Sequence, residues 1–274
     1  MSTTLAALLD EFERLWPAAG AEAWDAPGLV CGSPGQAISR VLLTVDVTSA
    51  VLDEAIDGGF DLIVAHHPYI MRGVNSLAEN SAKGAVLSRA IRHGVAIFAA
   101  HTNADIVEDG VSAALAAAFG LVDVRPLVAT AGNPAVGHGR LGNLAEATTL
   151  ETFAAAVAGA VPATVSGVRV AGSPERIVQR VALCGGAGDS FIGEAFAQAA
   201  DVYVTSDLRH HVTQDAKESV DLGLGGPALI DVSHWAAESL WLEIAAGQIA
   251  GIFEGLQVVA SHLRTDPWDF VVAQ

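Results

Sequence analysis

The stretch Asp61-Leu62-Ile63-Val64-Ala65-His66-His67-Pro68 decides the fold. Its unbroken apolar part is typical of a strand that is buried on both faces. A similar run lies at residues 41–47, and residues 49–57 between the two have the pattern of a helix that ends at Gly58-Gly59. Buried strands that alternate with helices predict a parallel sheet covered on both faces. We therefore expect an α/β protein.

The same order of elements returns in the second half of the chain. Val181-Ala182-Leu183, a glycine-rich turn, a helix and the run at residues 201–204 repeat the order that begins at Val41. Both copies run into a double histidine, His66-His67 in the first and His210-His211 in the second. This pattern predicts an internal duplication and two packed α/β domains with mainly parallel sheets. The alternative is a chance similarity between two βαβ units of like composition.

A Pro- and Gly-rich stretch at residues 125–144 marks the expected domain boundary. The first α/β domain is then predicted at 1–128 plus 232–274, and the second at 129–231. Apolar spacing also predicts helices over residues 5–16 and 149–161, with Thr3 or Thr4 as the cap of the first.

Composition excludes several classes of protein. The chain has 274 residues and a net charge of −17, which argues against a nucleic-acid partner because phosphate contacts need clustered Lys and Arg. Its two cysteines, Cys31 and Cys184, form no metal motif or disulfide framework. No apolar segment is long enough to span a membrane, and the N-terminus does not have the pattern of a signal peptide. We expect a soluble, cytoplasmic protein.

Three predicted strand ends carry histidines and carboxylates. His66 and His67 follow one strand, the segment from His101 to Asp105 follows the next, and His234 and Glu238 follow a third. Loops beyond the carboxyl ends of parallel strands converge, so these side chains should meet. Residues 234 and 238 share one helix face if the helix begins near Ser233, whose hydroxyl is a suitable N-cap.

This mixture of imidazoles and carboxylates favours Zn, Fe, Mn, Co or Ni over Ca. Five ligands exceed what one catalytic zinc takes, whereas two ions bridged by a carboxylate fit the number and would activate a shared water as hydroxide. Each motif also has an ordinary interpretation. Adjacent histidines on a strand point to opposite faces, so both bind one site only if the chain has turned, as Pro68 favours; otherwise they are hydrogen-bonded loop residues. Asp105 could cap a turn, and His234 with Glu238 could be a surface pair.

Two further histidines are candidates for catalysis. His101 could support a ligand or contact a substrate, and His211 lies after another strand end, where it could carry a proton. The glycine-rich loop at residues 185–190 could hold an anion with its backbone amides, although a tight turn is the favoured explanation.

These motifs together resemble the Nif-three-like dinuclear metal-centre family, whose members often carry the name GTP cyclohydrolase I type 2 homolog. The resemblance covers nearly the whole chain. It rests on Trp24-Asp25 with Gly28-Leu29 and Gly32, Asp46-Val47-Thr48, His66-His67-Pro68, His101-Thr102-Asn103 with Asp105, Cys184-Gly185-Gly186 with Gly188, Thr205 with Asp207 and His211, and His234 with Glu238. The chain departs from the family's pattern at Ser206 and at Ala26-Pro27, which affects expected substrate contacts rather than the metal ligands.

The resemblance implies a metal site in which His66, His67, Asp105, His234 and Glu238 are the ligands of two divalent ions per chain. It also implies a toroidal homohexamer in the cytoplasm. The function that follows is a dinuclear metal-dependent hydrolase, similar to GTP cyclohydrolase I type 2, with a nucleotide or related small molecule as substrate. The alternative is a non-catalytic metal-binding assembly with a regulatory or protein-interaction role.

Overall fold

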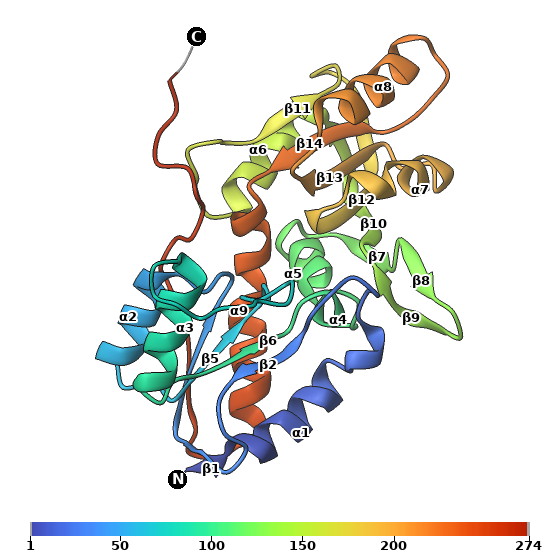
Figure 1. The fold of residues 1–274 in the computed structure, drawn as a ribbon. Helices are drawn as coiled ribbons and strands as arrows, with labels where there is room; N and C mark the ends of the chain where they lie inside the picture. Colours follow the sequence, from blue (N-terminus) through green and yellow to red (C-terminus); the bar gives the residue numbers. More distant parts are fainter. Residues whose placement is uncertain (1, 273–274) are drawn as a thin grey trace. The chain divides into compact units, whose positions relative to one another are not determined.

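The structure, a computed structural model, describes residues 2–272 and contains two α/β units (Figure 1). The first unit runs to Ala104 and adds Trp241–Thr265, and the second consists of Asp105–Leu240 and the residues from Asp266 onwards. Each unit has its own sheet and helices, which confirms the predicted α/β class.

The first unit contains a five-stranded sheet of order β15-β4-β5-β6-β2. Its first four strands are parallel, and the edge strand β2 is antiparallel to β6. The elements in chain order are β1 (Thr3–Thr4), α1 (Leu5–Leu15), a 3₁₀ turn (Ala18–Gly20), β2 (Gly28–Cys31), β3 (Ala37–Ile38), β4 (Arg40–Thr44), α2 (Ser49–Asp57), β5 (Leu62–Ala65), α3 (Ala82–Arg92), β6 (Ala96–Ala99), α4 (Thr102–Asp105), which ends in the second unit, and β15 (Gln257–Ala260).

Local sequence signals explain where these elements begin and end. The hydroxyl of Thr4 accepts a hydrogen bond from the backbone of α1, and Thr48 does the same for α2. Gly59, just after α2, adopts a φ of 65°, which a residue with a side chain adopts only at a cost. The predicted helices over residues 5–16 and 49–57 are thus confirmed, with α1 ending one residue early.

The second unit contains a six-stranded mixed sheet of order β11-β14-β13-β12-β10-β7, in which β12, β13 and β14 are parallel. Its remaining strands are antiparallel to their neighbours. The elements in chain order are α5 (Val111–Ala118), β7 (Val122–Arg125), β8 (Val128–Thr130), β9 (Asn133–His138), β10 (Arg140–Thr149), α6 (Leu150–Ala160), β11 (Arg169–Ala171), β12 (Ile177–Ala187), a 3₁₀ turn (Asp189–Phe191), α7 (Ile192–Ala197), β13 (Val202–Ser206), α8 (His210–Asp221), β14 (Ala228–Val232) and α9 (His234–Ile252), which ends in the first unit.

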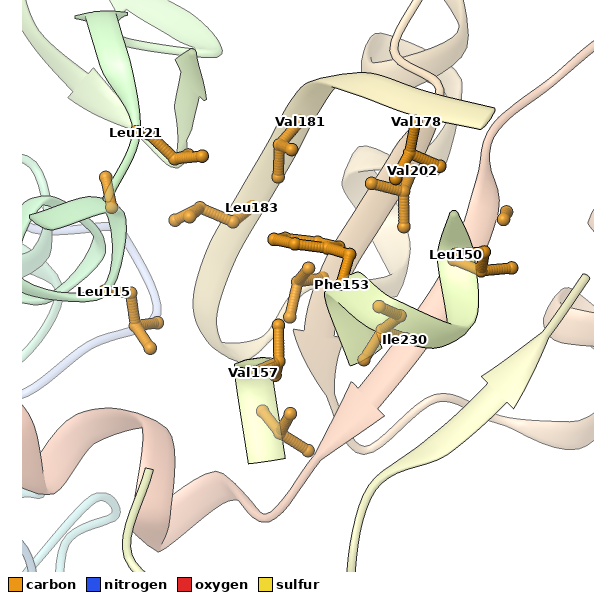
Figure 2. Close-up of a cluster of buried hydrophobic side chains, with 14 of the residues drawn as sticks. Leu115, Leu121, Leu150, Phe153, Val157, Val178, Val181, Leu183, Val202 and Ile230 are labelled. Carbon is orange, nitrogen blue, oxygen red and sulfur yellow. The ribbon is translucent and has the colours of Figure 1, made fainter. Parts of the chain in front are cut away.

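The core of the second unit is almost wholly aliphatic, as the low aromatic content predicts. Phe153 of α6 lies among leucines and valines from the strands, and Figure 2 shows these side chains filling the space between helix and sheet. Buried apolar side chains pack against the sheet of the first unit as well, so both sheets are held by apolar contacts.

Matching hydrogen bonds support the predicted duplication, which stays a prediction. Asp61 donates its backbone N–H to Arg40 and accepts one from Ala96, and Asp201 has the same two partners in Arg180 and Ala228. By strand register, Leu62 corresponds to Val202. His66 and His67 then correspond to Ser206 and Asp207, and the His210-His211 pair instead begins helix α8.

The compact units divide the chain differently from the predicted domains at 1–128 plus 232–274 and at 129–231. The Pro- and Gly-rich stretch contains the β8–β9 hairpin and the start of β10, which pairs with both β7 and β12. Helix α5 packs against β12 and so belongs to the second unit as well. The glycines of this stretch are typical of tight hairpin turns.

Within residues 2–272, no helix combines the length and the apolar character that a membrane span requires. Cys31 and Cys184 are both free thiols.

Candidate metal centre

The histidines of the first unit lie beyond the carboxyl ends of its parallel strands, as the sequence predicts. His66 follows β5 directly and is completely buried. Its Nδ1 donates a hydrogen bond of 2.9 Å to the carbonyl oxygen of Ala100, at the end of the neighbouring strand β6. Because a carbonyl oxygen only accepts, the hydrogen lies on Nδ1 and Nε2 carries the lone pair.

His67 is held by a carboxylate instead. Its Nδ1 lies 2.7 Å from an oxygen of Asp46, in the loop that follows β4. The second carboxylate oxygen of Asp46 accepts a hydrogen bond of 2.6 Å from the hydroxyl of Thr265. The imidazole of His67 is therefore fixed by a carboxylate that is itself fixed.

His101 follows β6 and contacts a buried aspartate. Its Nδ1 lies 2.7 Å from Asp25, whose side chain is fully buried. Asp25 also accepts hydrogen bonds from the backbone N–H groups of Ala26 and Thr102 and from the Thr102 hydroxyl. Burial acts to raise the pKa of Asp25, but the hydrogen bonds from His101 and Thr102 lower it below its usual value. Asp25 is thus an ionised buried carboxylate.

Burial lowers the pKa of His101 to about 4, assisted by the nearby His66 and opposed by Asp25. The imidazole is therefore neutral at pH 7, which is the form that ligates a metal ion.

The three imidazoles form one cluster. One ring nitrogen from each of His66, His67 and His101 lies within 4.8 Å of the others, so the set could hold a metal ion. The rings of His66 and His67 have centroids 5.1 Å apart. The two adjacent histidines therefore reach the same space, which the alternation of a regular strand would prevent. The chain has left strand geometry here, as Pro68 favours.

The second unit supplies a histidine and a carboxylate from one helix. His234 and Glu238 lie on the same face of the first turns of α9, with His234 Nε2 2.9 Å from Glu238 Oε1. Ser233 caps this helix by accepting a hydrogen bond from the backbone of Ala236, so the predicted helix start is confirmed. Glu238 is buried, with 2% of its surface exposed.

His234 also has an aspartate at its other nitrogen. Its Nδ1 lies 2.7 Å from Asp207, which follows β13. Burial acts to lower the pKa of His234, but the carboxylates of Glu238 and Asp207 raise it to about 11. Metal binding to this imidazole would release a proton.

Asp105 and His211 complete the set of predicted residues. Asp105 ends α4 and belongs to the second unit, where its negative charge helps to raise the pKa of the buried Cys184 thiol after burial itself. His211 is exposed in the first turn of α8. Among the described residues it is in no cluster that could hold a metal ion.

The glycine-rich loop at residues 185–190 has a different role from either predicted one. Gly185 and Gly186 are part of β12, and Gly186 adopts a φ of 70°. A Cβ at Gly186 would lie 2.5 Å from Glu238 Oε1 and 3.3 Å from His234 Nε2. Glycine is required here because a side chain would collide with the two predicted ligands.

The sequence did not predict that Asp25, Asp46 and Asp207 each contact a histidine. All three lie in the motifs quoted above, but no contact was assigned to them. Asp46 and Asp207 lie at predicted strand ends, which is a usable signal. Asp25 precedes β2, and only the antiparallel pairing of β2 with β6 brings it to His101.

Comparison with known proteins identifies relatives over nearly the full length. The family model described as Duf34/NIF3 (NGG1p interacting factor 3) matches residues 3–267. A Streptomyces coelicolor protein named GTP cyclohydrolase 1 type 2 homolog is 42% identical over 98% of this chain and 95% of its own length. A Mycobacterium leprae protein of the same name is 32% identical over 98% of this chain and 96% of its own length.

Solved structures show the same fold. A hypothetical protein of Staphylococcus aureus has a TM-score of 0.89 and 28% identity, and covers 98% of this chain and 99% of its own. A Bacillus cereus protein related to NIF3 has the same TM-score of 0.89 with 24% identity, and its coverage is also 98% and 99%.

Proposed function

Because the chain belongs to the Duf34/NIF3 family, we propose that it is a dinuclear metal-dependent hydrolase of the kind named GTP cyclohydrolase 1 type 2 homolog. Its substrate would be a nucleotide or a related small molecule. The observation that carries this proposal is the cluster of His66, His67 and His101, whose ligand atoms lie within 4.8 Å of one another.

The proposed ligands are His66, His67, Asp105, His234 and Glu238. Their donor chemistry fits a divalent transition metal, because neutral imidazole and carboxylate together suit Zn, Fe, Mn, Co or Ni. When bound, two ions would lower the pKa of a shared water and polarise the group that it attacks.

The protein's own residues would orient the ligands and move protons. His101 lies in the cluster with His66 and His67 and has Asp25 at Nδ1, so its Nε2 is the atom that could contact a bound ion or accept and return a proton. His211 is exposed at the start of α8 and is the second candidate for this role. Glu238, buried beside His234, and Asp105 are the carboxylates that would help to hold the ions.

Turnover assays test this proposal. Purified protein loaded with Zn, Mn, Fe, Co or Ni is incubated with GTP, other nucleotides and simple phosphodiesters, and the products are separated by chromatography. We expect metal-dependent ring opening or hydrolysis of at least one of these compounds, and loss of that activity in His66→Ala. A metal-loaded protein that leaves all of them unchanged contradicts the proposal.

A second function is favoured by the family description itself, which names an interacting factor. In this alternative the centre is not catalytic, and the protein is a metal-binding regulatory or interaction assembly. His66→Ala would then disturb metal storage or partner binding, and no turnover would exist to be lost. A metal-dependent activity that disappears in His66→Ala contradicts this alternative.

A further inference from the structure

Three imidazoles at the strand ends share one kind of hydrogen bond, between Nδ1 and an aspartate. The Nδ1 atoms of His67, His101 and His234 each lie 2.7 Å from an aspartate oxygen, contributed by Asp46, Asp25 and Asp207 respectively. Such a contact places the ring hydrogen on Nδ1 and turns Nε2 away from the carboxylate. It also makes the imidazole a stronger ligand, because the carboxylate stabilises the positive charge that develops on the ring.

The aspartates are themselves held in place. Asp25 is fixed by three hydrogen bonds from Ala26 and Thr102, and Asp46 by one from Thr265. Asp207 has a φ of 55°, a left-handed conformation that non-glycine residues rarely adopt and that costs stability. The chain keeps this unfavourable conformation where it brings a carboxylate to His234.

The strand register gives an independent reason to group these residues. Asp207 follows Val202 by five residues, as His67 follows Leu62, and Val202 and Leu62 occupy equivalent positions in the two sheets. The equivalent position therefore holds the imidazole of His67 after β5 in the first unit. In the second unit, after β13, it holds the carboxylate of Asp207, which contacts the imidazole of His234. In each unit this position thus takes part in a histidine–aspartate contact.

We propose that Asp25, Asp46 and Asp207 are positioning residues, which hold His101, His67 and His234 with Nε2 directed to the metal centre. This inference rests on the proposed function, because it requires that the chain bind metal ions. Removal of an aspartate should weaken metal binding most where its carboxylate is most buried, since an exposed carboxylate is screened by water. The side chain of Asp25 is 0% exposed, that of Asp46 34% and that of Asp207 61%.

The test measures metal affinity rather than activity. Zn²⁺ and Co²⁺ are titrated into the full-length protein in competition with a chromophoric chelator, for the wild type and for Asp25→Asn, Asp46→Asn and Asp207→Asn. Asparagine preserves the size of the side chain but removes its charge. We expect metal affinity to fall by roughly 10- to 100-fold in Asp25→Asn, where the carboxylate is most buried, and by less in Asp207→Asn. The visible spectrum of bound Co²⁺ should change in the same variants.

Two matched controls exist in the chain. Asp61 and Asp201 are the equivalent aspartates of the two sheets, and each accepts hydrogen bonds from two backbone N–H groups without contacting a histidine. Asp61→Asn and Asp201→Asn should lower the unfolding temperature and leave metal affinity unchanged. If they weaken metal binding as much as the three positioning variants do, the effect is general destabilisation and the inference is wrong.

Double variants show whether each aspartate acts through its histidine. Asp46→Asn should have no further effect on affinity in a His67→Ala background, and the same holds for Asp207→Asn with His234→Ala and for Asp25→Asn with His101→Ala. Full additivity overturns the inference. A wild type that binds no metal refutes the proposed function, whereas a wild type that binds metal with unchanged affinity in all three Asn variants refutes only the positioning role.

Discussion

Gly186 brings the backbone of β12 against His234 and Glu238. Gly186→Ala should therefore push the Glu238 carboxylate out of place, because the new Cβ would lie 2.5 Å from its oxygen. We expect weaker metal binding in addition to a stability loss of about 1–2 kcal/mol from the left-handed backbone. Equilibrium metal titration and thermal unfolding measure the two effects separately.

Gly223→Ala is the control for this change. Gly223 has a similar φ of 72°, but a Cβ there meets nothing within 4 Å. It should lose a similar amount of stability and keep full metal affinity. Unchanged metal binding in Gly186→Ala would show that the close approach of the Gly186 backbone to His234 and Glu238 does not affect metal binding.

Cys184 gives a prediction about pH. Burial raises the pKa of its thiol to about 12, with Asp105 and Glu238 acting in the same direction. A folded-state pKa above the usual 9.0 means that the neutral thiol stabilises the fold fully below pH 9, and that this contribution is lost as the pH rises towards 12. At pH 8 iodoacetamide should modify Cys184 far more slowly in the folded protein than in urea, as mass spectrometry can measure. Equal rates would contradict this prediction.

At the residue scale, the sequence predicted the histidines and missed the groups that hold them. His66 and His67 adjoin each other and follow an apolar run, so a local pattern is enough to find them. The Asp25–His101 contact joins residues 76 positions apart, and it exists because β2 pairs with β6. Pairing of distant strands leaves no local signal in one sequence, so this contact could be found only in the structure.

At the scale of elements, Phe153 of α6 tests the core of the second unit. It is 3% exposed among aliphatic side chains (Figure 2). Phe153→Ala should lower the free energy of unfolding by about 3–5 kcal/mol, because it leaves a cavity that the stiff sheet cannot fill. Urea denaturation measures this loss.

Phe196→Ala is the matched control, because the Phe196 side chain is 51% exposed on α7. Its effect should stay within about 1 kcal/mol. Similar losses in both variants would mean that Phe153 does not support the core.

Helices and central strands were predictable because their signals are local. α2 and α6 have threonine caps and apolar spacing, and their bounds agree with the predictions to within a residue. β12 was predicted as three residues and extends from Ile177 to Ala187. The two ends of β12 contain polar residues and glycines. These residues adopt strand conformation only because β10 and β13 pair with them.

At the scale of the whole molecule, we propose a homohexamer located in the cytoplasm, as the family resemblance implies. Native mass spectrometry of the purified protein at low micromolar concentration should give a mass of six chains. A monomer or dimer at every concentration would contradict this proposal. The exposed apolar residues Trp268, Phe270, Val271 and Val272 are surface that assembly could cover.

Metal content is the most direct test of the central claim, that His66, His67, Asp105, His234 and Glu238 bind two ions. The wild type, His66→Ala from the first unit and Glu238→Ala from the second are purified identically, dialysed with a chosen metal and analysed by mass spectrometry of the element. The account predicts about two ions per chain in the wild type and a collapse of that content in both variants. Metal content that is unchanged in the variants would contradict it.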